Sequence, residues 1–271
     1  MKMKTKRKVK RIIFIVAPLS IIVACAAFFQ FTPFGYSMTI RLRSFTEVEH
    51  NIFINNTFSW VTEHDSGDLV GKEGVLRIIN ESRNRVSELF GGELLSDPII
   101  IISDNPNTFR ITGDANTWTM NFHRVFIYIS ISFRNLNVDI MAHEIAHAEL
   151  EYRVLRDKPF RRIDSFIPIW FNEGLASVPD YRDFMNEESL RRRLTYGGAD
   201  AHDVTQLTRA DFHDRRARDN LHFAFLVGDY FLLSRHKVLS WLEENGSDGL
   251  LRLIDGVRAG EDFNELFFDA R

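Results

Sequence analysis

The chain contains a single cysteine, Cys25, among 271 residues. No disulfide can therefore form within it, which excludes a disulfide-based scaffold and leaves the redox state of its compartment open. Internal repeats, low-complexity segments and phosphate-cradling glycine loops are also absent. The 24 phenylalanines are spread along the chain, which is typical of a hydrophobic core and not of a base-stacking platform.

Acidic residues are missing from the first eleven positions, which carry seven lysines and arginines. Without this basic tail the chain has 27 basic and 37 acidic residues, a net charge of −10. An acidic globule has no electrostatic affinity for phosphate backbones. The charge balance therefore argues against nucleic acid as a partner.

Charged residues are also absent from residues 12–40. Eighteen to twenty helical residues would cover about 27–30 Å, close to the thickness of the hydrocarbon core of a bilayer. A basic flank stays in the cytoplasm. We therefore expect a cytoplasmic tail at residues 1–11, a single transmembrane signal anchor at 12–31, and one globular domain at 42–271 on the outer side of the cell membrane.

Two alternatives remain for the same apolar segment. The small residues Ala24, Ala26 and Ala27 could border a cleavage site, which would make the protein secreted. Residues 22–25 (IVAC) resemble a bacterial lipobox, which would make it a lipoprotein attached through Cys25. The apolar residues that follow would form a poor solvated tether, which weighs against lipidation.

The most informative pattern is HEIAH at residues 143–147. The surrounding residues 138–153 lack Gly and Pro and repeat apolar side chains at helical spacing, so they predict a helix. His143 and His147, four positions apart, project from one face of that helix and can take two corners of a tetrahedral zinc site. Glu144 lies beside the metal without binding it, as suits a carboxylate that takes a proton from metal-activated water.

A catalytic zinc needs a third protein ligand and one open position. Glu151 lies one turn further along the same helix, rather than across the metal, and is the weaker candidate. Glu173 is the better one, because the apolar neighbours in residues 169–177 (IWFNEGLAS) argue against a freely solvated carboxylate. Gly174 and Ala176 are small enough to let this second predicted helix pack closely near the metal.

HEIAH followed by WFNEGLAS resembles the gluzincin group of metallopeptidases, the clan of thermolysin and the zinc aminopeptidases. More narrowly, it resembles the bacterial peptidase MA-like domains over roughly residues 95–270, although only these two motifs are specific. The resemblance implies an α+β zincin-like domain with a small mixed sheet, an active-site helix and a helical C-terminal part. It also implies one zinc ion held by His143, His147 and Glu173, with Glu144 as general base.

These families also stabilise the oxyanion with a Tyr or His from a later helix, where a donor is worth about 3–4 kcal/mol. His222, in a helix predicted at residues 219–230, occupies that position. It is either the donor or a partly buried histidine without a role. Tyr230 lies more than two helical turns further on and is interpreted as a packing residue.

The remaining pattern predicts an ordinary mixture of strands and helices. Residues 125–132 form either the sheet edge that pairs with an extended substrate or an ordinary sheet strand. The segment at 155–168 is interpreted as a loop inserted between the motifs. Further expected elements are a strand at 98–103, a strand-rich region at 45–61, a loop or hairpin at 105–123, and helices at 72–90, 187–194, 221–235, 237–244, 249–257 and 262–268.

The sequence thus predicts a membrane-anchored zinc peptidase that hydrolyses peptide bonds in a peptide or protein substrate. The alternative is a catalytically weak or inactive peptidase-like scaffold that binds its partners at the membrane. Glu144 favours the enzyme, because a purely structural metal site does not need that carboxylate.

Overall fold

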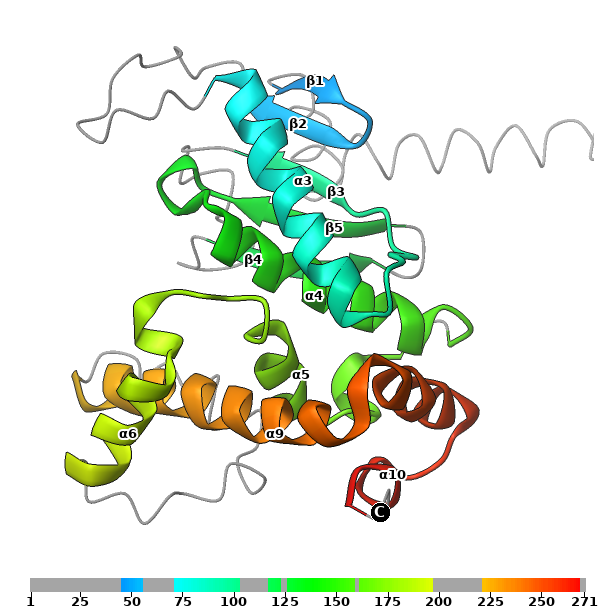
Figure 1. The fold of residues 1–271 in the computed structure, drawn as a ribbon. Coiled ribbons are helices and arrows are strands. Elements are labelled where there is room, and N and C mark those ends of the chain that lie inside the picture. The colour runs from blue at the N-terminus through cyan, green and yellow to red at the C-terminus, as the bar shows by residue number, and fades with distance from the viewer. Residues whose placement is uncertain are drawn as a thin grey trace, which may run out of the picture.

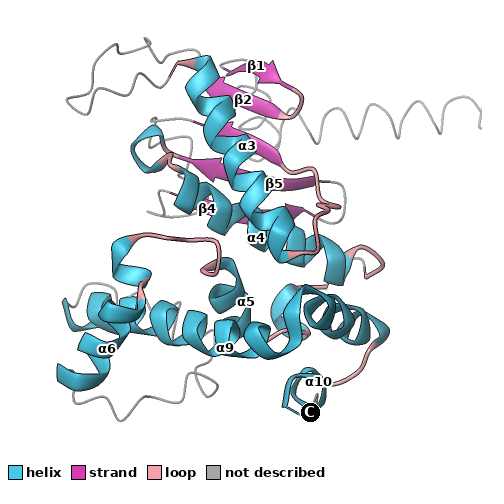
Figure 2. Cartoon of the chain, in the orientation of Figure 1, coloured by secondary structure: helices cyan, strands magenta, loops and turns pink. Residues whose placement is uncertain are grey.

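A computed structural model describes residues 45–55, 71–102, 117–122, 126–158, 161–196 and 221–268. The expected basic tail, the transmembrane anchor and Cys25 lie outside these ranges. Within them, no helix combines the length and the apolar character needed to cross a membrane. The described part mixes helices with one small sheet, as expected (Figures 1 and 2).

The sheet has five strands in the order β1-β2-β3-β5-β4. The central pairs, β2 with β3 and β3 with β5, are parallel, while the outer pairs are antiparallel. Two isoleucine-rich strands meet in its middle, where Ile100 lies opposite Ile129. The strands are β1 (Phe45–Glu49), β2 (Ile52–Asn55), β3 (Ile99–Ile102), β4 (Thr117–Phe122) and β5 (Phe126–Ile131).

The strand predicted at 125–132 exists as β5, but it does not form the sheet edge. It pairs with β3 on one side and β4 on the other, so β4 is the outer strand of this side of the described sheet. The edge interpretation of residues 125–132 is therefore wrong. Of the loop or hairpin expected at 105–123, the described residues 117–122 form β4, whose antiparallel partner β5 lies outside that range. All residues from 127 to 131 are buried, as an internal strand requires.

Two helices lie side by side over the sheet, α3 (Lys72–Leu89) and α4 (Val138–Leu155) (Figure 1). The apolar stripe of α3 buries Val75, Ile79 and Val86, at the spacing that the sequence predicts. The helix α4 begins at Asn137, whose side-chain oxygen accepts a hydrogen bond from the Ile140 amide at 2.9 Å. This cap fixes the start of the helix that carries the HEIAH motif.

The second part of the domain is helical and lies on the other side of α4 (Figure 1). It comprises α5 (Ile169–Ala176), α6 (Glu187–Tyr196), α9 (Leu221–Ala259) and α10 (Phe263–Phe268). Short 3-10 helices at Phe133–Asn135, Ile163–Ser165 and Asp183–Met185 precede α4, α5 and α6, respectively. In the residues described, the inserted segment at 155–168 is a loop apart from Leu155, the last residue of α4, and the 3-10 helix at Ile163–Ser165.

The helix α9 continues through the break that the sequence analysis places between residues 235 and 237. That boundary is wrong, because no glycine or proline interrupts the chain between residues 229 and 245. The real interruption is Gly246, whose φ of 64° and ψ of −173° fall in a region open only to glycine. The predicted helices at 221–235 and 237–244 are thus one helix.

An aromatic cluster fixes α5 against the C-terminal helices. Trp170 and Phe171 are buried, and their rings lie 5.2 Å from Phe267 and 5.0 Å from Phe263 in edge-on contacts. Trp241 stacks on Phe267 and donates its indole hydrogen to the Phe267 carbonyl. Such edge-on contacts add to the hydrophobic contribution of ring burial. The residues immediately before Asn172 and Glu173 are therefore firmly held.

Candidate metal site

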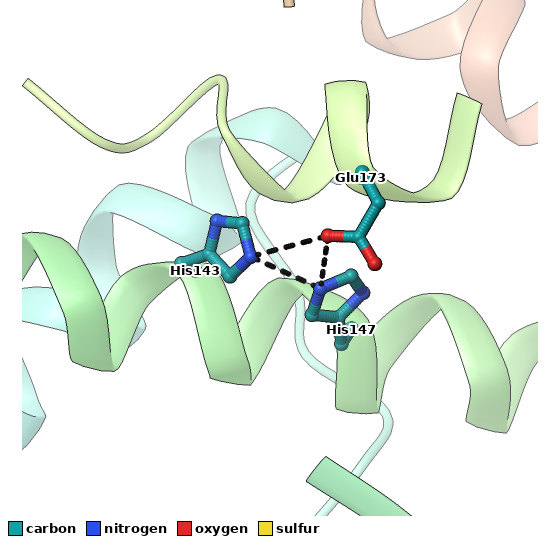
Figure 3. A group of neighbouring side chains, drawn as sticks. All are labelled: His143, His147 and Glu173. Carbon is teal, nitrogen blue, oxygen red and sulfur yellow. Dashed lines mark hydrogen bonds and ion pairs between the residues drawn. The ribbon is translucent and has the colours of Figure 1, made fainter. Parts of the chain in front are cut away.

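Three side chains that are distant in sequence converge where α4 meets α5 (Figure 3). The Nε2 atoms of His143 and His147, both on α4, are 3.1 Å apart. The Oε2 atom of Glu173, on α5, lies 3.6 Å from His143 Nε2 and 3.3 Å from His147 Nε2. These are the ligand positions predicted from the sequence, and the structure brings all three together.

The three separations suit a single tetrahedral metal ion. Ligand atoms at 2.0–2.1 Å from a tetrahedral zinc are separated by about 3.3 Å from one another. The observed separations of 3.1, 3.3 and 3.6 Å lie around that value. Two imidazoles and one carboxylate also suit other divalent transition metals, so the donor set does not single out zinc.

The site is recessed but not sealed. The side chains of His143, His147 and Glu173 keep 13%, 12% and 18% of their surface exposed. Among the described residues the donors number three, which leaves the fourth tetrahedral position open, the arrangement of a catalytic rather than a structural site. The weaker candidate Glu151 does not belong to this group of ligands.

Asn172 holds the imidazole of His147 in one orientation. Its Oδ1 atom lies 2.9 Å from His147 Nδ1 and accepts the hydrogen of that nitrogen. An oxygen acceptor at Nδ1 requires Nδ1 to carry the proton in the neutral ring, which leaves the lone pair of Nε2 facing His143 and Glu173. This contact was not predicted, although Asn172 is adjacent to the expected ligand Glu173.

The charges of the site are strongly coupled. Burial alone lowers the pKa of His147, but the charge of Glu173, with smaller contributions from Glu144 and Asn172, raises it to about 9. Burial in turn raises the pKa of Glu173, but His147 and His143 hold it well below its usual range. Without a metal ion, His147 and Glu173 therefore form an imidazolium–carboxylate pair.

Glu144 is next to the ligands without being one of them. It follows His143 on α4, is 7% exposed, and its charge contributes to the raised pKa of His147. The described ligand group contains His143, His147 and Glu173 only. A carboxylate in this place can exchange protons with a molecule bound at the open position.

Gly174 lies against α9. A Cβ atom on Gly174 would be 2.5 Å from the Ser234 carbonyl oxygen and 2.9 Å from Val238 Cγ2. The sequence analysis expects this small residue to bring α5 close to the helix of the HEIAH motif, and that expectation is wrong: the neighbours of Gly174 are on α9. The carbonyl of Ser234 thus sets the position of the helix turn that carries Glu173.

The sequence analysis considers two residues of α9, His222 as a hydrogen-bond donor and Tyr230 as a packing residue. The backbone of His222 belongs to the first turn of α9, but its side chain lies outside the described residues. Tyr230 is 3% exposed, as a packing residue would be. Burial, with the charge of Glu173, holds the pKa of its phenol far above the usual value.

Comparison with protein-family models, curated proteins and solved structures gives no match for this chain.

Proposed function

We propose that this chain is a zinc-dependent peptidase with a gluzincin-like, zincin-type fold, anchored in the cell membrane by residues 12–31. The observation that carries the proposal is the convergence of His143, His147 and Glu173 at metal-binding distances, with Glu144 beside them. The two histidines and Glu144 come from one HEIAH helix, and the third donor comes from a helix that meets it only in the fold.

His143, His147 and Glu173 would hold the metal, and Asn172 would orient His147. A zinc ion bound there would lower the pKa of a water molecule and polarise a carbonyl group. Zinc is favoured over harder cations because two of the three donors are imidazole nitrogens. A peptide bond suits this site, because its hydrolysis needs a proton taken from water and delivered to the departing amine, which a single carboxylate beside the ligands can do.

Glu144 supplies both proton transfers. Its carboxylate takes a proton from the attacking water and later passes that proton to the departing amine, so one residue acts first as base and then as acid. Placement beside the ligands keeps the carboxylate close to the water without occupying the open position. His222 is the proposed hydrogen-bond donor to the oxyanion, as the sequence resemblance implies.

The test compares full-length wild-type protein in detergent with Glu144→Gln, His143→Ala and the control Glu187→Gln, which changes an exposed carboxylate on α6. Metal content and cleavage of a peptide library are measured on the same samples. Glu144→Gln should retain one zinc and lose at least about 100-fold in turnover. His143→Ala should lose both zinc and turnover, while Glu187→Gln should keep both.

Unchanged turnover of Glu144→Gln would refute its role as base. Wild-type protein that binds zinc but cleaves no peptide would support the alternative, a peptidase-like scaffold at the membrane. Wild-type protein without stoichiometric metal would overturn both the zinc site and the activity.

The membrane location needs a separate test. After cell fractionation, the full-length chain should resist extraction from membranes by alkali, and protease added from the outer side should remove the domain at 42–271. Cys25→Ser should leave both results unchanged if residues 12–31 form the anchor. Release of the Cys25→Ser protein would instead favour a lipoprotein, and a shortened, freely soluble product would favour cleavage.

A further inference from the structure

The two histidines of the site are oriented by different means. His147 has a hydrogen-bonding partner for its second nitrogen, since Asn172 Oδ1 lies 2.9 Å from Nδ1. His143 has none among the described residues, although its Nδ1 is buried. Metal-binding histidines are usually oriented by such a bond. Within the described part of the chain, contacts other than a hydrogen bond to Nδ1 hold the imidazole of His143 with its Nε2 toward Glu173.

The imidazole of His143 is held between two rings. His147 meets it edge-on, with ring centroids 4.7 Å apart and planes at 81°. Phe231, on α9, meets it at 6.0 Å and 74°. Edge-on contacts have a preferred geometry, so a ring held in this way resists rotation about its χ2 angle. His147 is itself a proposed ligand, so of these two ring contacts Phe231 provides the one from outside the ligand group.

We propose that Phe231 is a positioning residue of the metal site, whose ring fixes the imidazole of His143 in place of a hydrogen bond. This inference rests on the proposed metal site and goes beyond it, because Phe231 provides no ligand. It also assigns a role to α9, a helix that contributes none of the three donors.

Phe231 lies on a part of α9 that contacts both helices carrying the proposed ligands. Ser234 follows it by three residues, so the two lie on neighbouring positions of one helix face. Phe231 contacts His143 of α4, while the Ser234 carbonyl contacts Gly174 of α5. A single face of α9 thus supports both helices that provide ligands. A shift of α9 would move the imidazole and the carboxylate together.

The experiment uses full-length protein with Phe231→Leu, which keeps apolar bulk but removes the flat ring. Phe231→Tyr keeps the ring and should restore wild-type behaviour. Phe268→Leu is the matched control, since it removes a ring that meets Phe267 edge-on at 5.0 Å on α10 and belongs to no part of the site. Three quantities are measured: zinc affinity by competition with a chelator, the visible spectrum of the Co²⁺-loaded protein, and the metal-free melting temperature.

Phe231→Leu should bind zinc about 10–100-fold more weakly, the range found when outer-shell support of a ligand is lost. Its Co²⁺ spectrum should change in band position or intensity, because the geometry of one ligand is no longer fixed. Phe231→Tyr should match the wild type in both. Phe268→Leu should change neither, even where it lowers the melting temperature. A purely structural role of Phe231 would lower stability and leave the Co²⁺ spectrum as it is.

Wild-type zinc affinity and an unaltered Co²⁺ spectrum in Phe231→Leu would overturn this inference and leave the proposed function standing. If Phe231→Leu does not fold, Phe231→Met, with a flexible side chain of similar volume, replaces it and is judged by the same criteria. Failure of the wild type to bind zinc or Co²⁺ would instead remove the metal site itself. The two failures are therefore distinguishable.

Discussion

The α-carbon of Gly174 faces the backbone carbonyl of Ser234 so closely that a Cβ atom would lie 2.5 Å from its oxygen. The obstacle is backbone within a helix, which cannot rotate away as a side chain could. Because Gly174 directly follows the proposed metal ligand Glu173, the contact couples the packing of α5 on α9 to the position of that carboxylate.

We predict that Gly174→Ala forces α5 away from α9 and weakens the site. Overpacking of this kind costs about 1–3 kcal/mol of stability, and the displaced Glu173 should lower zinc affinity as well. Urea unfolding of the metal-free protein and zinc titration measure the two effects. Gly71→Ala is the control, since nothing lies within 4 Å of its Cβ position. Equal zinc affinity of Gly174→Ala and wild type would contradict the proposed coupling.

Asn172→Ala tests the orientation of His147. Removing the acceptor of the His147 Nδ1 hydrogen should reduce zinc affinity by about 10–100-fold, while Asn172→Asp, which keeps an oxygen acceptor, should lose less. Calorimetric or chelator-competition titrations measure the zinc affinity of each variant. Asn84→Ala, at an exposed position of α3, provides the control for an asparagine lost from a helix. Identical losses for Asn172→Ala and Asn172→Asp would show that the hydrogen bond does not orient the ring.

Local patterns were sufficient to predict the helix of the metal motif. Residues 138–153 carry helical periodicity and no breaker, and α4 spans Val138–Leu155. The convergence of Glu173 with the two histidines was also predictable, since an ion site needs a third donor, the apolar neighbours of Glu173 argue against a freely solvated carboxylate, and the resemblance to gluzincins implies the same ligand. Both predictions depend on residues close together in the sequence and on the number of ligands that a metal ion needs.

Contacts between distant segments were not predictable in the same way. The neighbour of Gly174 depends on where α9 lies, and nothing in the sequence of α5 encodes that position. The same applies to Phe231 and His143, which meet only after α9 has packed on α4. The false break near residue 236 has a different cause, because the glycine that ends the first half of α9 lies ten residues further on, at Gly246.

Glu149 anchors the metal helix to the segment before β3. It is fully buried, accepts hydrogen bonds from the amides of Leu95 and Ser96, and pairs with Arg153 one turn along α4. Glu149→Ala would leave a cation and two amides without their acceptor, so we expect a loss of about 3–5 kcal/mol. Chemical denaturation measures the loss. The control is Glu88→Ala, which removes an exposed carboxylate on α3. Similar stabilities of the two variants would show that Glu149 does not anchor the helix.

From the interaction of His147 with Glu173 we predict that a rise in pH lowers the stability of the metal-free protein and raises its affinity for zinc. The pKa of His147 is raised from 6.5 to about 9, so its contribution to the stability of the metal-free protein is complete below pH 6.5 and is lost as the pH rises through 9. The pKa of Glu173 is lowered from 4.5, so the effect lies in the acidic range. Its contribution to the stability of the metal-free protein is present above pH 4.5 and is lost on strong acidification. The metal-free melting temperature should therefore fall between pH 6.5 and 9.

Zinc affinity should rise over the same range, because the metal must displace the proton of His147. The apparent association constant should increase about tenfold per pH unit until the pH approaches 9. Chelator competition at constant ionic strength measures it, with melting curves recorded in parallel with and without zinc. Glu173→Gln removes the charge that raises the pKa of His147, so in this variant the fall of the metal-free melting temperature should largely disappear. A melting temperature that falls equally in wild type and Glu173→Gln would show that other groups cause the pH dependence.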